Sequence, residues 1–190
     1  MIFSVKEILD IVLMTVALGF IFKDYFKKPT KANEPYDPIK ALTQKDQSSF
    51  WLAMLVIAPG IILHEFGHKF VALGFGASAT FEAAYTFLLI AVILKLAKSP
   101  FLFFVPAYVA WSGTVSHEQV LLIALAGPAV NFFIWLGAHL ALKYKKVPTR
   151  HISIIMLTRK INGFLAIFNM LPIPFFDGFH VYKQLFIIFF

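Results

Sequence analysis

A long apolar segment, residues 50–81, is interrupted only by the sequence His64-Glu-Phe-Gly-His68 and the Lys69 that follows it. No other ionisable side chain lies in the segment. A run of this length and polarity predicts a helix that crosses a membrane, because about 20 largely apolar residues span a bilayer. Ionisable groups are costly at that depth and occur there mainly where they have a function. This cluster therefore constrains both the fold and the chemistry of the chain.

The composition also indicates an integral membrane protein. Charged residues make up 14% of the chain, compared with about 25% in soluble domains. The net charge of +7 fits lysine-rich loops near lipid headgroups, and there is no arginine-rich helix or basic aromatic platform, so we expect no nucleic-acid partner. The chain has no cysteine, which excludes disulfides and leaves His, Asp, Glu or water as metal ligands.

The apolar segments predict an all-α polytopic membrane protein with about five to six transmembrane helices in a single domain, residues 1–190. Residues 1–22 would contain the first helix, residues 23–49 a polar connector, and residues 50–178 the core. The spans predicted by length and polarity are Ile8–Phe22, Phe50–Phe75, Gln119–Leu142 and Ile152–Leu171. Two further apolar segments are shorter: Ala83–Leu94 could cross the membrane, re-enter it or lie at its interface. The ten residues of Val181–Phe190 cannot cross a bilayer, so a truncation after residue 190 or an ending in a half-helix stays open.

One segment favours extended structure instead of a helix. Phe101–Val115 is rich in β-branched and aromatic residues and contains Pro106 and Gly113. Unpaired strands cannot face lipid, so this segment must pack against protein or line a cavity. We therefore expect a short re-entrant extended or β segment within the helical fold.

The HEFGH sequence has the spacing of a zinc site. His64 and His68 are four residues apart and lie on one face of a helix, so both imidazoles can reach one metal ion. The side chain of Glu65 points in a neighbouring direction around the helix axis, where it can act as a general base without being a ligand. A third ligand must come from elsewhere. The candidates among the remaining carboxylates and histidines are Glu82, Glu118, Asp177, His117, His139, His151 and His180.

Asp177 is the strongest of these candidates. It follows a segment in which Pro172 and Pro174 end a helix inside an apolar region. A broken helix of this kind is tolerated only where protein or water receives its backbone groups. The neighbouring phenylalanines make a solvated surface charge a poor explanation for this aspartate.

Three motifs in this order resemble those of the site-2 protease family of intramembrane zinc metalloproteases, in its archaeal and bacterial form. They are HEFGH, Gly127-Pro-Ala-Val-Asn131, and the Asn-x-x-Pro-x-Pro-x-x-Asp-Gly sequence from Asn169 to Gly178. The resemblance covers residues 50–178. Phe176 stands where the family usually has leucine, a mild departure.

The resemblance implies one zinc ion per chain, bound by His64, His68 and Asp177, with Glu65 as the catalytic base and Asn131 binding the scissile carbonyl or the developing oxyanion. Asn169, Pro172 and Pro174 would shape the turn that carries Asp177. The implied activity is regulated intramembrane proteolysis, the hydrolysis of peptide bonds within or near transmembrane segments of membrane-protein substrates. The implied location is the lipid bilayer of a prokaryotic cell, as a multi-pass protein. The family also has an extended segment at the place of Phe101–Val115 that can hold substrate as an added strand.

Other interpretations stay open. The same ligands could belong to a non-catalytic zinc-binding membrane protein or a metal transporter, although a transporter is expected to carry further ligands along several spans. Another class of HExxH membrane protease would take Glu82 or Glu118 as its third ligand. Glu65 could instead pair with Lys69, four residues away. Asn131 could be a hydrogen-bonding residue between helices, and Gly127 could serve close packing.

Overall fold

The computed structural model describes residues 2–26, 47–99 and 105–190, which form mostly helices. Its helices are α1 (Val5–Phe22), α3 (Gln47–Gly74), α4 (Tyr85–Leu96), α5 (His117–Lys143), α6 (Ile152–Phe168) and α7 (Asp177–Phe189). Its strands are β1 (Ser78–Ala83) and β2 (Ala107–Ser112), and short 3-10 turns occupy Lys23–Phe26 and Thr149–His151.

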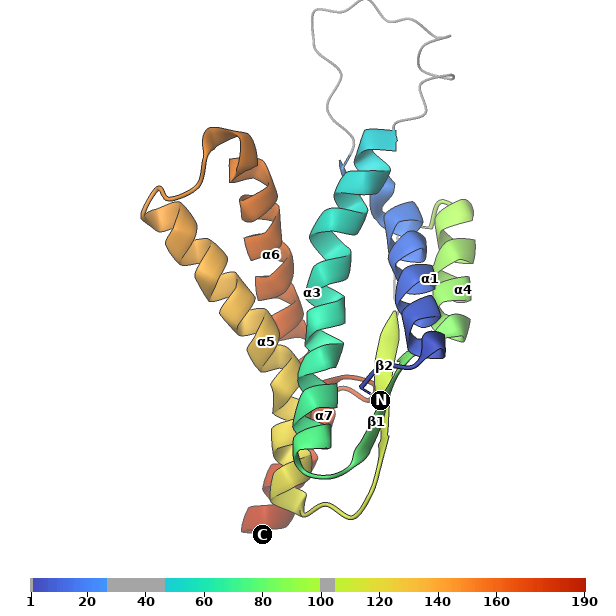
Figure 1. Cartoon of the computed structure of the whole chain (residues 1–190), viewed down its shortest axis with the longest axis vertical. Helices are drawn as coiled ribbons and strands as arrows, with labels where there is room; N and C mark the ends of the chain where they lie inside the picture. Colours follow the sequence, from blue (N-terminus) through green and yellow to red (C-terminus); the bar gives the residue numbers. More distant parts are fainter. Residues whose placement is uncertain (1, 27–46, 100–104) are drawn as a thin grey trace, which may run out of the picture.

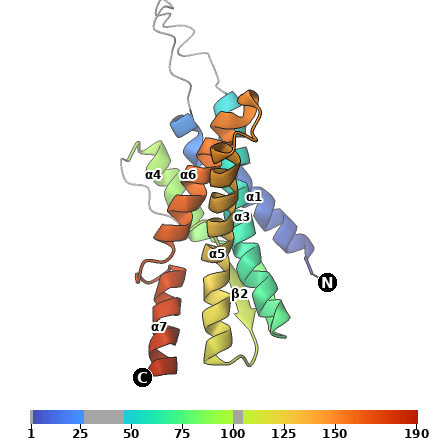
Figure 2. The same ribbon diagram turned by 90° about the vertical axis from the view of Figure 1, so that its left-hand side faces the viewer.

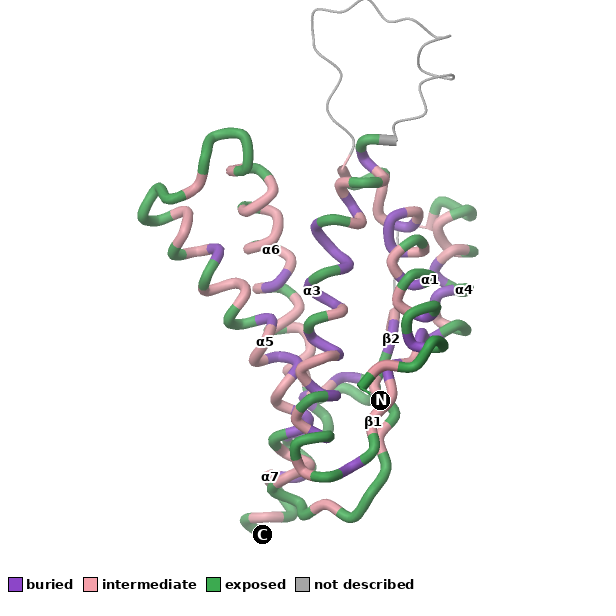
Figure 3. The backbone as a smooth tube through the Cα atoms, viewed as in Figure 1, coloured by how far each residue is buried: buried purple, intermediate pink, exposed green. Residues whose placement is uncertain are grey.

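Helix α3 lies at the centre of the molecule (Figure 1). Helices α1 and α4 lie on one side of it and α5 and α6 on the other, while the two strands run beside its C-terminal half. Figure 2 shows α7 continuing in the direction of α6 after a loop, next to the start of α5. Buried residues follow α3, whereas long stretches of α5, α6 and α7 are intermediate or exposed (Figure 3). Exposed apolar side chains on the outer helices suit a lipid environment.

Over the described residues, three helices are long and apolar enough to cross a membrane: α3, α5, and α6 with the turn before it. The expectation of five to six spans was therefore too high. The predicted first span does form α1, but this helix of 18 residues carries Lys6, Glu7 and Asp10. Helices α4 and α7 have 12 and 13 residues, which reach only about 18–20 Å of a hydrocarbon core of about 30 Å.

The two strands form an antiparallel pair, from Ser78 opposite Ser112 to Ala83 opposite Ala107. The expected extended segment is confirmed in β2, while residues 101–104 lie outside the described part of the chain. Its partner β1 was not predicted. The predicted connector, residues 23–49, falls mostly outside the described residues, and its ends belong to the 3-10 turn and to α3.

Helix α1 closes the edge of β1 that faces away from β2. The carboxylate of Glu7 accepts a hydrogen bond from the backbone N–H of Phe81 at 2.8 Å, and that of Asp10 accepts one from Ala83 at 3.3 Å. Because a bare strand edge in an apolar environment would leave these donors unsatisfied, the two acidic residues give α1 a structural task. This role accounts for the two acidic residues that make α1 less apolar than a simple spanning helix.

A buried ion pair joins α1 to α3 directly after the HEFGH sequence. Lys69 pairs with Glu7, both side chains are almost fully buried, and the Lys69 ammonium lies 4.4 Å from the centre of the Phe3 ring. Lys69 therefore does not serve as the partner of Glu65. The pair holds the N-terminal end of α1 against the helix that carries both histidines.

Replacing Lys69 by methionine is expected to destabilise the protein by about 3–5 kcal/mol, because it leaves the Glu7 carboxylate buried without its cation. Unfolding of the detergent-purified protein measures this loss. Lys6→Met is the control, since Lys6 pairs with Glu82 at an exposed position, and it should cost far less. Equal losses in the two variants would contradict the assignment of Lys69 as a structural anchor.

Candidate metal centre

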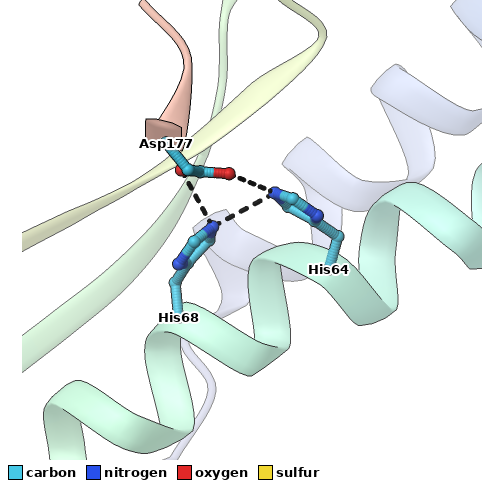
Figure 4. A group of neighbouring side chains, drawn as sticks. All are labelled: His64, His68 and Asp177. Atoms are coloured by element: carbon cyan, nitrogen blue, oxygen red, sulfur yellow. Dashed lines mark hydrogen bonds and ion pairs between the residues drawn. The ribbon is translucent and has the colours of Figure 1, made fainter. Parts of the chain in front are cut away.

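Two histidines and one aspartate meet where α3 passes the start of α7 (Figure 4). The Nε2 atom of His64 lies 3.0 Å from Oδ2 of Asp177, and Nε2 of His68 lies 3.2 Å from Oδ1 of Asp177. The two Nε2 atoms are 3.1 Å apart. The ligand atoms of a tetrahedral zinc site lie about 3.3 Å from one another. The three side chains therefore have the spacing of one face of such a site.

Hydrogen bonds at the back of the two imidazoles fix which nitrogen faces this cluster. Nδ1 of His68 lies 2.7 Å from the carbonyl oxygen of Ile123, and Nδ1 of His64 contacts Oδ1 of Asn131. A carbonyl oxygen only accepts, so each neutral ring carries its proton on Nδ1 and turns the Nε2 lone pair toward the cluster. Two lone pairs and a carboxylate facing one another at this distance are an arrangement that a bound cation stabilises. The donor set therefore fits a metal ion.

Helix α5 approaches the cluster at a glycine. A Cβ atom on Gly127 would lie 2.2 Å from Nε2 of His68 and 2.6 Å from Nε2 of His64. On α3, a Cβ on Gly67 would lie 2.8 Å from the carbonyl oxygen of Ala126. The helices cross closely at these two glycines, and the absence of a side chain at Gly127 preserves the space between the histidine nitrogens.

The loop before α7 brings Asp177 to the histidines. Helix α6 ends at Phe168, and Pro172 and Pro174 cannot continue it because they lack a backbone N–H. The loop is closed by Gly178, whose N–H donates to the carbonyl of Asn169 at 2.7 Å. A Cβ at Gly178 would lie 2.4 Å from the Met170 carbonyl oxygen, so only glycine fits there. The residues that the family resemblance assigns to this turn do lie in it.

Glu65 lies on α3 between the two histidines and is 7% exposed. Its carboxylate forms no hydrogen bond or ion pair with any residue that the structure describes, because Lys69 is paired with Glu7. A general base needs an oxygen that is free to accept a proton. The expected role of Glu65 stays a prediction, and its surroundings leave the carboxylate available for it.

Asn131 lies behind His64 and is fully buried on α5. Besides contacting His64, its amide nitrogen donates to the carbonyl of Gly60 at 3.2 Å and to Oδ1 of Asn162 at 2.8 Å. A contact with a scissile carbonyl stays a prediction, and it would require Asn131 to release one of these acceptors. Asn162 was not predicted as a site residue, although an amide in an apolar helix is a signal of a buried hydrogen bond.

The other candidate ligands lie outside the cluster, which is the single group of three possible metal-binding side chains in the described part of the chain. Most have other partners: Glu82 binds Lys6 and Tyr108, Glu118 binds Ser116, His117 binds Gln184, His139 stacks on Trp135, and His151 contacts Arg150. His180 follows Asp177 on α7 but is exposed and does not join the cluster.

The sequence has relatives among known proteins. It is 32% identical over 181 residues to a protein of Methanocaldococcus jannaschii named "putative zinc metalloprotease", and the alignment covers 95% of this chain and 85% of the relative. It is 28% identical over 134 residues to a Synechocystis protein of the same description, covering 70% of this chain and 31% of that longer protein. No protein-family model matches the chain. No solved structure matches it either.

Proposed function

The chain belongs to the zinc metalloprotease family of its Methanocaldococcus jannaschii relative, and we propose that it is an intramembrane endopeptidase of the site-2 protease type. It hydrolyses peptide bonds within or near transmembrane segments of other membrane proteins, in the cell membrane of a prokaryote. The observation that carries the proposal is the meeting of His64, His68 and Asp177 beside helices that are apolar enough to cross a membrane. A metal site at that position is better suited to a membrane-spanning substrate than to a soluble one.

In this proposal each side chain of the site has a separate task. His64, His68 and Asp177 hold zinc, which when bound lowers the pKa of a water molecule and polarises a carbonyl group. Glu65 accepts the proton of the attacking water and passes it to the leaving amine. The buried surroundings exclude other water and strengthen these electrostatic interactions.

We propose that the substrate is held as an extended strand along β2. In an antiparallel pair, the backbone N–H and C=O groups of successive residues alternately face the partner strand and point away from it. The N–H of Ala84 donates to the carbonyl of Pro106, so Pro106 faces β1. The backbone groups of Val109 then point away from β1. Since α1 occupies the outer edge of β1, the edge of β2 is the one left for pairing within the part of the chain that the structure describes. Pairing there would offset the cost of unwinding a substrate helix.

Strand β2 also runs along the part of α3 that carries the histidines. Ala107 packs in a cluster with Ile57 and Ile61, before the HEFGH sequence, and Trp111 packs against a cluster that includes Ala72, after it. A strand added to β2 would therefore follow α3 past the metal centre.

Val109→Pro tests this strand pairing. The change removes an N–H that points away from β1, and we expect cleavage of a membrane-helix substrate to fall roughly 2–10-fold through the loss of one backbone hydrogen bond. Zinc content should not change. The control is Val109→Thr, which keeps the N–H and the β-branched shape. A cleavage rate in Val109→Pro equal to that of the control would exclude pairing at this edge.

Metal content and cleavage, measured together on the detergent-purified protein, test the proposed function. We expect about one zinc per chain by elemental analysis, reversible loss of activity with a chelator, and no stable zinc in Asp177→Ala. The substrate pair is a reporter with a transmembrane helix and the same cleavable sequence in a soluble peptide. Preferential cleavage of the membrane reporter supports the proposal.

One outcome would overturn the proposed function, and another would overturn the assignment of its third ligand. Zinc binding without cleavage of either reporter would favour a non-catalytic zinc protein. Retention of zinc in Asp177→Ala would move the third ligand to another side chain. A transporter finds little support, because the described residues contain a single group of three possible ligands, with no further group along the spans.

A further inference from the structure

Two amide side chains lie buried behind the metal centre, in helices that are apolar enough to cross a membrane. Asn131 on α5 is fully buried and Asn162 on α6 is 1% exposed. An amide at such a position is costly unless its polar atoms find hydrogen-bonding partners. Here the partners form a continuous chain from α6 through α5 to the imidazole of His64 on α3.

The direction of this chain is fixed by two backbone carbonyls. The Asn162 amide nitrogen donates to the carbonyl of Thr158 at 2.9 Å, so its oxygen is left to accept from Asn131. The Asn131 amide nitrogen also donates to the carbonyl of Gly60 at 3.2 Å. Rotating either amide by half a turn would set oxygen against oxygen. Each amide therefore has one orientation that satisfies its partners.

The end of the chain is the metal ligand. Because the Asn131 nitrogen is directed at Gly60 and Asn162, its oxygen faces Nδ1 of His64. That oxygen can only accept, so His64 carries its proton on Nδ1 and presents Nε2 toward Asp177 and His68. Asn162 thus acts on a ligand with which it shares no direct hydrogen bond.

Close packing at Gly60 supports the same arrangement. A Cβ atom there would lie 2.9 Å from Oδ1 of Asn162 and 3.3 Å from its amide nitrogen. The glycine lets α6 come near enough to α3 for Asn162 to reach Asn131. Helix α6 supplies no ligand to the cluster, yet it ends the hydrogen-bonded chain that orients one.

We propose that Asn162 is a positioning residue for the metal centre: acting through Asn131, it fixes the orientation and tautomer of His64. This inference rests on the proposed metal-binding function. It predicts that α6 influences metal affinity through hydrogen bonding, whereas a residue that only holds helices together would act on stability alone.

The test is a double-mutant cycle on metal affinity, read from the absorption of cobalt titrated into the metal-free protein in detergent and from zinc competition. Asn131→Leu is expected to weaken binding about 10–100-fold, and Asn162→Leu about 10-fold, as for other residues that support a ligand. If Asn162 acts through Asn131, the double variant binds as Asn131→Leu does, within about twofold. Losses that multiply would overturn the proposal, as would wild-type affinity in Asn162→Leu.

Gln184→Leu is the matched control. Gln184 is a buried amide on α7 whose oxygen lies 2.8 Å from Nδ1 of His117, a histidine outside the metal cluster. Its removal should leave cobalt affinity unchanged, and a loss equal to that of Asn162→Leu would make the effect a general one of deleting a buried amide. Asn162→Ala repeats the cycle if the leucine variant does not fold, as judged by circular dichroism.

A second measurement separates this inference from the proposed function. In metal-free protein with 15N-labelled histidine, NMR reads the tautomer of His64 without any metal. We expect Nδ1 of His64 to carry its proton in wild type, whether or not Nε2 also carries one beside Asp177, and to lose it in part of the molecules in Asn162→Leu. If wild type binds no metal, the proposed function fails while the tautomer still decides the role of Asn162. An unchanged tautomer in Asn162→Leu overturns the positioning role.

Discussion

Replacing Glu65 by glutamine is expected to leave about one zinc per chain while lowering cleavage of a membrane-helix reporter by about 10²–10⁴-fold, the usual contribution of a general base. Glutamine has nearly the same shape but cannot accept a proton from water. Its amide also meets no competing partner, because the Glu65 carboxylate is hydrogen-bonded to none of the described residues. The measurement is the initial cleavage rate together with elemental analysis of the same preparation.

Glu118→Gln is the control for this variant. Glu118 is a carboxylate at the exposed start of α5, where it accepts from the Ser116 hydroxyl at 2.6 Å, and its change should leave cleavage near the wild-type rate. Wild-type activity in Glu65→Gln would place the base elsewhere. Loss of zinc in Glu65→Gln would instead make Glu65 a ligand and leave the catalytic base unassigned.

The sequence was most informative where chemistry depends on local spacing. The two histidines follow from a four-residue interval on one helix, and the broken helix before Asp177 follows from two prolines. The structure brings these three side chains together across more than 100 residues of chain. Helix type was also predictable for the long apolar segments that form α3 and α5. In each case the signal lies within a single segment.

Features that depend on a neighbouring element were not predictable in the same way. Strand β1 has no strong pattern of its own and exists because β2 pairs with one edge and α1 closes the other. The number of spans was overestimated because the predicted first span forms a helix that carries Glu7 and Asp10, which bind the strand. The helices of the two shorter apolar segments, α4 and α7, have only 12 and 13 residues. Asn162 gave only the general signal of an amide in an apolar helix. Only the structure shows that its hydrogen-bonding partner is Asn131 on α5.

Gly127 shows the same limit and gives the second large prediction. Its place in a motif indicated close packing, but only the structure shows that the packing is against the metal-binding nitrogens. A methyl group 2.2 Å from Nε2 of His68 must displace a histidine or move α5. Either shift breaks the ligand set, so Gly127→Ala is expected to lower zinc affinity by more than the roughly 10–100-fold that loss of a supporting residue costs. Cleavage should disappear with the metal.

Gly137→Ala separates this effect from the general consequences of adding a methyl group to α5. Gly137 lies on the same helix, and a Cβ there would meet no atom within 4 Å. Alanine favours a helix over glycine by about 1 kcal/mol, so the two substitutions increase helix propensity equally. Only Gly127→Ala introduces a steric clash. We therefore expect Gly137→Ala to bind zinc and cleave as wild type does. If Gly127→Ala also retains full zinc affinity while remaining folded, the metal does not lie between the two Nε2 atoms, and the site must be sought on another side of the histidines.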